Sequence, residues 1–91
     1  MTITRQLSIT GRVQGVGYRM YMVRKARELG LSGWVRNRHD GRVEAVIQGT
    51  PEAMAQMMVW ARHGPRQAEV ERIEVEPDEG AFTAFEMRPT E

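Results

Sequence analysis

Apolar and polar residues alternate near the start of the chain, and the spacing then changes to that of a helix. Every second position between residues 7 and 13 is apolar or glycine, as in a strand with one buried face. From residue 18 onward the apolar positions recur at helical spacing: Tyr18, Met22, Ala26 and Leu29. Gly30 suits the left-handed turn that commonly ends a helix. The pattern therefore predicts a strand followed by a helix.

The middle of the chain has the pattern of a hairpin. Residues 33–37 indicate a short strand, and apolar residues alternate with polar ones again from residue 43 to residue 47. The dipeptide Asp40-Gly41 between them is favoured in tight hairpin turns. We therefore predict a second and a third strand joined by a tight turn.

A second helix is predicted after this hairpin. Thr50 offers an N-cap hydroxyl, and proline is well suited to the first helical position, here Pro51. One apolar stripe follows at helical spacing: Met54, Met57, Met58 and Ala61. Gly64 and Pro65 are expected to end this helix.

Residues 70–75 indicate a fourth strand, and residues 82–87 a short final one. The order strand, helix, strand, strand, helix, strand corresponds to two β-α-β units joined by a hairpin. Because such crossovers are right-handed, both helices are expected on one face of the sheet. We predict an α+β fold, a ferredoxin-like split β-α-β sandwich with an antiparallel sheet of four to five strands.

The length and composition of the chain limit the kinds of functional site and the cellular locations that we expect. A chain of 91 residues is expected to form a single domain over residues 1–91, with any site in a surface groove or loop. The absence of cysteine excludes disulfides, thiolate nucleophiles and cysteine-based metal sites. No apolar run approaches the length of a membrane span, and no signal peptide is visible. A cytoplasmic protein without a membrane partner is therefore expected.

The numbers of acidic and basic residues are balanced, but almost all of the basic residues are arginines. A net charge of +1 does not favour capture of long nucleic acids. Of the 13 basic residues only Lys25 is a lysine, and the guanidinium fork of arginine matches phosphate or carboxylate. Surface ion pairs and codon bias account for most of these arginines, and one of them calls for a different explanation.

The segment between the first strand and the first helix carries the strongest chemical signal. Gly15 and Gly17 flank Val16 and allow the chain to curl, so that successive backbone N–H groups point at one spot. The positive end of the following helix faces the same spot. Arg19 adds a charge and a bidentate fork, although a cation in the first turn opposes the helix dipole. Together these features predict a nest for a small dianion; the glycine pair alone fits an ordinary tight turn better.

Asn37 is the second candidate. It ends the predicted second strand, and its place before the Asp40-Gly41 bend also suits a turn-forming residue. Its proximity to Arg19 depends on strand order and register, which local patterns do not reveal.

Two motifs together carry a family resemblance. The chain reads Gly-x-Val-Gln-Gly-Val-x-Tyr-Arg over residues 11–19 and Gly-Trp-Val-x-Asn over residues 33–37. Asp-Gly and Val-Glu-Ala follow within residues 40–45. With these motifs the chain resembles the acylphosphatase family, in the form of a stand-alone bacterial-type member. The resemblance runs from Arg5 to about Met87.

The resemblance implies a ferredoxin-like sandwich that hydrolyses acyl phosphates to a carboxylate and inorganic phosphate. It implies a phosphate cradle formed by five residues: Gly15, Val16, Gly17, Tyr18 and Arg19. It further implies that Arg19 holds the phosphate, that Asn37 places the water, and that neither a cofactor nor a metal takes part. The family often has phenylalanine where this chain has Tyr18, a mild departure because the ring can keep its packing role.

The resemblance also sets the expected partners. These are a small-molecule acyl phosphate and inorganic phosphate as product and competitive inhibitor, for a monomer that binds no nucleic acid. Acylphosphatase-like domains also occur within larger maturation proteins, so a non-catalytic module that binds phosphate or carbamoyl phosphate is one alternative. An RNA-binding ferredoxin-like module is the other, although the third strand lacks the aromatic signature of such sheets.

The remaining candidate side chains have simpler explanations. His39 and His63 have no carboxylate or cysteine at ligand spacing, so we interpret both as surface residues. His39 could touch a substrate from the rim of the site, but no pattern in the sequence requires it. Trp34 and Trp60 are candidates for stacking on bases. For Trp34 packing against the sheet or the helices is the preferred interpretation, and Trp60, which lies off the apolar stripe, is expected to be partly exposed.

Overall fold

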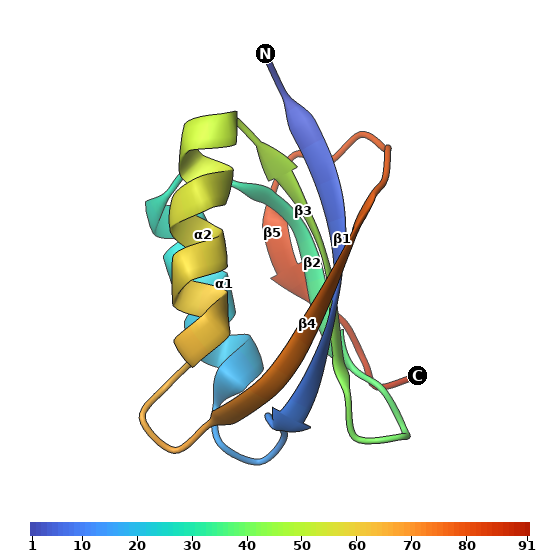
Figure 1. Ribbon diagram of the computed structural model, residues 1–91. Coiled ribbons are helices and arrows are strands. Elements are labelled where there is room, and N and C mark those ends of the chain that lie inside the picture. Colours follow the sequence, from blue (N-terminus) through green and yellow to red (C-terminus); the bar gives the residue numbers. More distant parts are fainter.

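The computed structural model describes residues 1–91 and has two layers (Figure 1). Two helices lie side by side on one face of a five-stranded sheet, and the other face of the sheet is uncovered. The elements follow in this order: β1 (Ile3–Arg12), α1 (Tyr18–Glu28), β2 (Ser32–Asn37), β3 (Val43–Gly49), α2 (Pro51–His63), β4 (Glu69–Pro77) and β5 (Phe85–Met87). The predicted ferredoxin-like α+β fold is confirmed.

The strands lie in the order β4-β1-β3-β2-β5, with β1, β3 and β2 in the interior of the sheet. β1 pairs antiparallel with both β3 and β4, and β2 pairs antiparallel with β3. The register sets Leu7 opposite Ala45, and Ala45 opposite Val35 on the next strand. Residues of the same face are thereby brought into one row beneath the helices.

The hydrophobic core fills the space between the sheet and the two helices. The apolar positions of the alternating pattern in β1, Leu7 and Ile9, are fully buried. The stripe of α2 is buried as predicted at Met54, Met57 and Ala61, while Met58 is partly buried against the core. Each large apolar side chain fully buried in this way contributes about 1.5–3 kcal/mol to the stability of the fold.

The final strand differs from the predicted antiparallel arrangement. β5 runs parallel to β2, so the sheet is mixed. After β4 the chain crosses the end of the sheet, where Asp78 N–H donates to the carbonyl of Thr4 at 3.1 Å and Gln48 Nε2 donates to that of Gly80 at 2.7 Å. Because β2 begins at this same end, the returning strand runs in its direction. Phe85, 1% exposed, anchors the short strand in the core.

The two tryptophans pack within the fold. Trp34 is only 9% exposed, and the guanidinium groups of Arg36 and Arg88 lie over its ring, 4.8 and 4.7 Å from the centroid. The ring of Trp60 lies 5.3 Å from that of Tyr18. Trp34 is therefore packed as predicted, and Trp60 is partly buried against the core, which agrees with the partial exposure expected for it.

Tyr18 links the start of α1 to the end of α2. Its hydroxyl donates to the carbonyl of Ala61 at 2.7 Å, one of the last carbonyls of α2, which lack partners within the helix. Burial raises the pKa of the Tyr18 hydroxyl well above its ordinary value, so it keeps the proton that it donates. The hydroxyl thus gives the tyrosine a role that phenylalanine cannot fill.

Replacing Tyr18 by phenylalanine is expected to lower the free energy of unfolding by about 1–2 kcal/mol, because a buried carbonyl loses its donor. Urea denaturation followed by circular dichroism measures this change. Tyr21→Phe is the matched control, because Tyr21 is 42% exposed and its hydroxyl makes no hydrogen bond. Equal stabilities of the two variants would show that the Tyr18 hydroxyl does not stabilise the fold.

Candidate active site

The loop that leaves β1 curls before it enters α1. Gly15 and Gly17 have φ angles of 74° and 83°, in the left-handed region that favours glycine. Gly17 is the N-cap residue of α1, and a Cβ at this position would lie 3.3 Å from the ring of Tyr21. The predicted requirement for glycine at both positions is therefore present in the backbone.

The backbone N–H groups at the N-terminus of α1 are not capped by a side chain. The first turn of the helix also carries no acidic residue. The backbone N–H groups of residues 15–17 donate to no carbonyl or side chain of the chain. Free N–H groups at the positive end of a helix form a favourable environment for an anion.

Arg19 and Asn37 line the same pocket. Its volume is about 120 Å³, and nine residues from the loop, α1, β2 and β5 line it: Val13, Gln14, Gly15, Gly17, Tyr18, Arg19, Met20, Asn37 and Met87. Of the predicted cradle residues only Val16 is missing from this lining; its side chain packs on the core and borders the neighbouring surface hollows. The fold thus brings together two side chains that the sequence separates.

The guanidinium of Arg19 has no partner within the protein. It forms neither an ion pair nor a hydrogen bond, and the side chain is half-buried. Arg36, in contrast, is bound to Glu44 and Glu91 at 2.8 and 2.6 Å. The fork of Arg19 is therefore free to bind an anion bidentately.

The side chain of Asn37 has an unusual oxygen. Oδ1 is buried and has no hydrogen-bond donor, which for a neutral polar atom costs about 1–3 kcal/mol. The backbone of Asn37 is held in place, because it pairs with Val43 and its carbonyl accepts the N–H of Glu91 at 3.1 Å. A buried acceptor without a donor marks a place for a water molecule or a ligand group.

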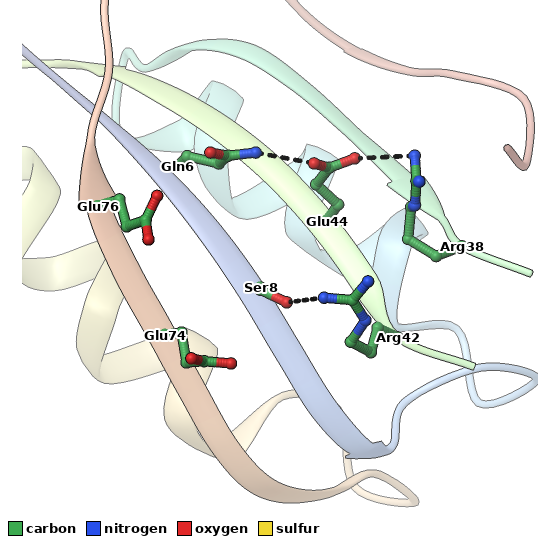
Figure 2. A pocket seen from close by; sticks show the side chains of 7 residues that line it. All are labelled: Gln6, Ser8, Arg38, Arg42, Glu44, Glu74 and Glu76. Atoms are coloured by element: carbon green, nitrogen blue, oxygen red, sulfur yellow. Dashed lines mark hydrogen bonds and ion pairs between the residues drawn. The ribbon is translucent and has the colours of Figure 1, made fainter. Parts of the chain in front are cut away.

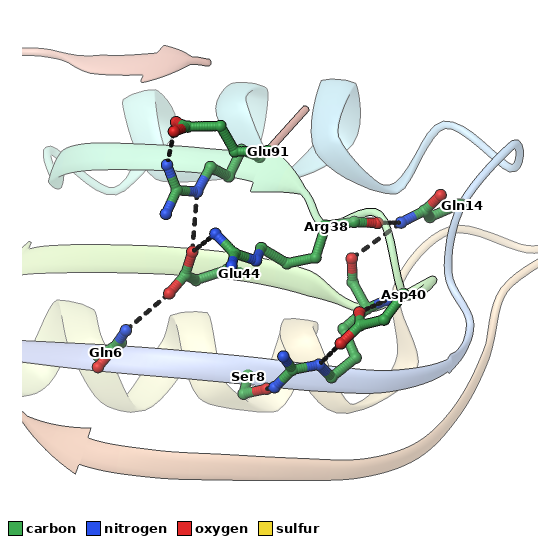
Figure 3. A network of polar contacts seen from close by, with 9 residues as sticks. Gln6, Ser8, Gln14, Arg38, Asp40, Glu44 and Glu91 are labelled. Atoms are coloured by element: carbon green, nitrogen blue, oxygen red, sulfur yellow. Dashed lines mark hydrogen bonds and ion pairs between the residues drawn. The ribbon is translucent and has the colours of Figure 1, made fainter. Parts of the chain in front are cut away.

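Gln14 fastens the loop to the hairpin that follows Asn37 (Figure 3). Its Nε2 donates to the carbonyls of Arg38 and Arg42 at 2.8 and 2.9 Å. The turn itself is closed by Asp40, which accepts the backbone N–H of Arg42 at 3.1 Å, and this hydrogen bond holds the pKa of the carboxyl below its ordinary value. Gln14 therefore sets the distance between the two halves of the pocket.

A larger hollow of about 250 Å³ lies on the uncovered face of the sheet (Figure 2). Seven polar or charged residues line it: Gln6, Ser8, Arg38, Arg42, Glu44, Glu74 and Glu76. Both of its arginines are already occupied, since Arg38 pairs with Glu44 at 3.4 Å and Arg42 donates to Ser8 at 2.9 Å. The two β4 carboxylates, Glu74 (paired with Arg72 at 3.5 Å) and Glu76, add negative charge to its lining, so this hollow does not suit an anion.

Four lining residues were not singled out as site residues from the sequence. Val13 and Gln14 stand within the loop motif, so their positions already carried a signal. Met20 follows Arg19 in α1, whereas Met87 reaches the pocket only because β5 pairs with β2, opposite Val35. No local pattern could have identified Met87.

The histidines lie outside the pocket. Both are exposed, as predicted; His39 does not line the pocket, and His63 Nδ1 lies 3.0 Å from the carbonyl of Val59 at the end of α2. No three His, Cys, Asp or Glu side chains lie together in a way that would hold a metal ion. Neither helix has the length and apolar character needed to cross a bilayer.

Comparison with known proteins agrees with the motifs. A family model described as Acylphosphatase matches residues 5–87. An acylphosphatase of Thiobacillus denitrificans is 54% identical over 85 residues, covering 93% of this chain and 96% of the relative. A solved acylphosphatase from Coxiella burnetii superimposes with a TM-score of 0.92 at 33% identity, covering 96% and 93% of the two chains. One from Bacillus subtilis has a TM-score of 0.90 at 31% identity, with 97% and 99% covered. The chain belongs to the acylphosphatase family.

Proposed function

We propose that this protein hydrolyses acyl phosphates to a carboxylate and inorganic phosphate without a metal ion. One observation carries the proposal: a free guanidinium and an unpartnered buried amide oxygen line the same small pocket at the N-terminus of α1. Membership of the acylphosphatase family supports the same reaction.

The chemistry demands little of the protein. An acyl phosphate is a mixed anhydride whose leaving group is a carboxylate, and the pKa of the corresponding acid is about 4. The carboxylate departs without a proton, so no general acid is required. Because phosphoryl transfer passes through a loose transition state, catalysis consists mainly of positioning and charge stabilisation.

Arg19 and the loop amides hold the phosphoryl group in this proposal. The free N–H groups of residues 15–17 and the guanidinium fork donate to its non-bridging oxygens. No internal carboxylate competes for Arg19, so its full charge acts on the substrate. These donors stabilise the charge that the phosphoryl oxygens carry in the transition state.

Asn37 orients the attacking water. Its Oδ1 accepts a hydrogen bond from the water, which leaves a lone pair of the water oxygen free to face phosphorus. A neutral amide does this without repelling the phosphate, whereas a negatively charged carboxylate would repel it.

The pocket offers no side-chain base. None of the nine lining residues is an acid or a histidine. The proton of the water therefore passes to a phosphate oxygen of the substrate. The new bond joins the water oxygen to phosphorus, the bond from phosphorus to the acyl oxygen breaks, and its electron pair leaves with the carboxylate.

Hydrolysis of benzoyl phosphate in the presence of a chelator tests the proposal. We expect turnover well above the spontaneous rate, unchanged by EDTA and inhibited competitively by inorganic phosphate. The fall in ultraviolet absorbance of the substrate measures the reaction. Phosphate binding without turnover would favour a non-catalytic binding module, and loss of activity with EDTA would contradict the metal-free mechanism.

A further inference from the structure

Two exposed methionines stand at the rim of the pocket. Met20 is 48% exposed and Met87 is 44% exposed, and both line the pocket together with Arg19 and Asn37. The other large apolar side chains on the surface lie elsewhere: Met1, Tyr21, Val59 and Val75. Two of the six exposed large apolar side chains of the protein therefore border this one small pocket.

The two methionines come from different elements and flank the two proposed catalytic residues. Met20 follows Arg19 in the first turn of α1. Met87 lies in β5 opposite Val35, two positions before Asn37 along β2. The wall around a phosphate bound in this pocket therefore contains both thioether side chains.

The charges of the pocket favour an uncharged substituent. Arg19 is the single charged side chain among the nine lining residues, and the proposed reaction uses it for the phosphate. The amide nitrogen of Gln14 is already bound to the two hairpin carbonyls. No further cation or anion in the lining would bind a second phosphate, a carboxylate or an amine on the acyl group.

We infer that Met20 and Met87 bind the acyl group of the substrate and make the enzyme selective for apolar acyl phosphates. The inference rests on the proposed function. Methionine is flexible and polarisable, so a pair of them adapts to aliphatic chains and contacts aromatic rings favourably. Burying part of such a chain or ring against the two thioethers is worth more than burying the single methyl of an acetyl group.

The test compares kcat/KM for benzoyl phosphate with that for acetyl phosphate. For the double variant Met20→Ala/Met87→Ala we expect the ratio to fall about tenfold, because the apolar contact area is lost. The double leucine variant, which keeps the apolar volume, is expected to retain most of the ratio. Val59→Ala is the matched control, because Val59 is 63% exposed on α2 and does not line the pocket.

A binding measurement gives a second readout that does not depend on turnover. Titration calorimetry with phenylphosphonate and methylphosphonate is expected to show tighter binding of the phenyl compound, and the difference is expected to shrink in the double alanine variant. An unchanged ratio of kcat/KM in that variant would overturn the inference, while hydrolysis of both substrates by the original protein would leave the proposed function standing. If the original protein hydrolysed neither substrate, both would fall.

Discussion

Replacing Arg19 by lysine is expected to lower kcat/KM for benzoyl phosphate by at least about a hundredfold, the loss typical of removing one donor from a preorganised anion site. Lysine keeps the positive charge but not the planar fork, so it cannot donate to two phosphoryl oxygens with fixed geometry. No other cation lines the pocket to compensate. Steady-state kinetics measures the loss.

The variant is expected to fold normally, because Arg19 makes no ion pair or hydrogen bond whose loss would destabilise the protein. Arg24→Lys is the matched control: it lies on the exposed side of the same helix, 5.6 Å from the ring centroid of Tyr21. Its activity is expected to match that of the unmodified protein. Near-normal hydrolysis by Arg19→Lys would show that the reaction does not require the guanidinium fork.

Replacing Asn37 by alanine is expected to lower kcat by about a hundredfold or more while the inhibition constant of inorganic phosphate changes little. The amide in the proposed mechanism contacts the water and not the phosphate, so ground-state binding survives its removal. Phosphate inhibition and turnover are measured on the same variant. A variant that turned over normally at saturation but failed to bind phosphate would reverse the proposed division of roles.

Stability provides an independent signature of the Asn37 site. The variant removes a buried oxygen that has no donor in the folded protein, so the free energy of unfolding is expected to stay the same or to rise. Ser32→Ala, at the other end of β2, is the matched control for activity. Lost turnover together with retained or increased stability distinguishes a catalytic role from a structural one.

Much of this protein follows from local patterns in its sequence. The change from alternation to helical spacing placed α1 at Tyr18, and the N-cap hydroxyl placed the start of α2, where Thr50 accepts the N–H of Ala53 at 3.1 Å. Gly15 and Gly17 were predicted from the conformations that only glycine adopts readily. These features depend on residues a few positions apart, so the sequence determines them directly.

The ends of the strands were less predictable, because they depend on pairing with a neighbouring strand and not on local patterns alone. The first strand was predicted from residue 7, but it begins at Ile3, which pairs with Gly49. β4 likewise extends over Glu69–Pro77, beyond the predicted residues 70–75. A strand continues as long as a neighbour accepts its backbone hydrogen bonds, whether or not its own side chains alternate.

The tertiary structure decided how the site is assembled. Asn37 and Met87 reach the pocket through the pairing of β2 with β3 and β5, and the hydroxyl of Tyr18 finds its acceptor on α2. Each of these contacts joins residues distant in the chain, and their energies depend on the register and direction of strands that pack as a unit. The sequence by itself determined the elements and the identity of the chemical groups, and only the packed sheet determined which of those groups share a pocket.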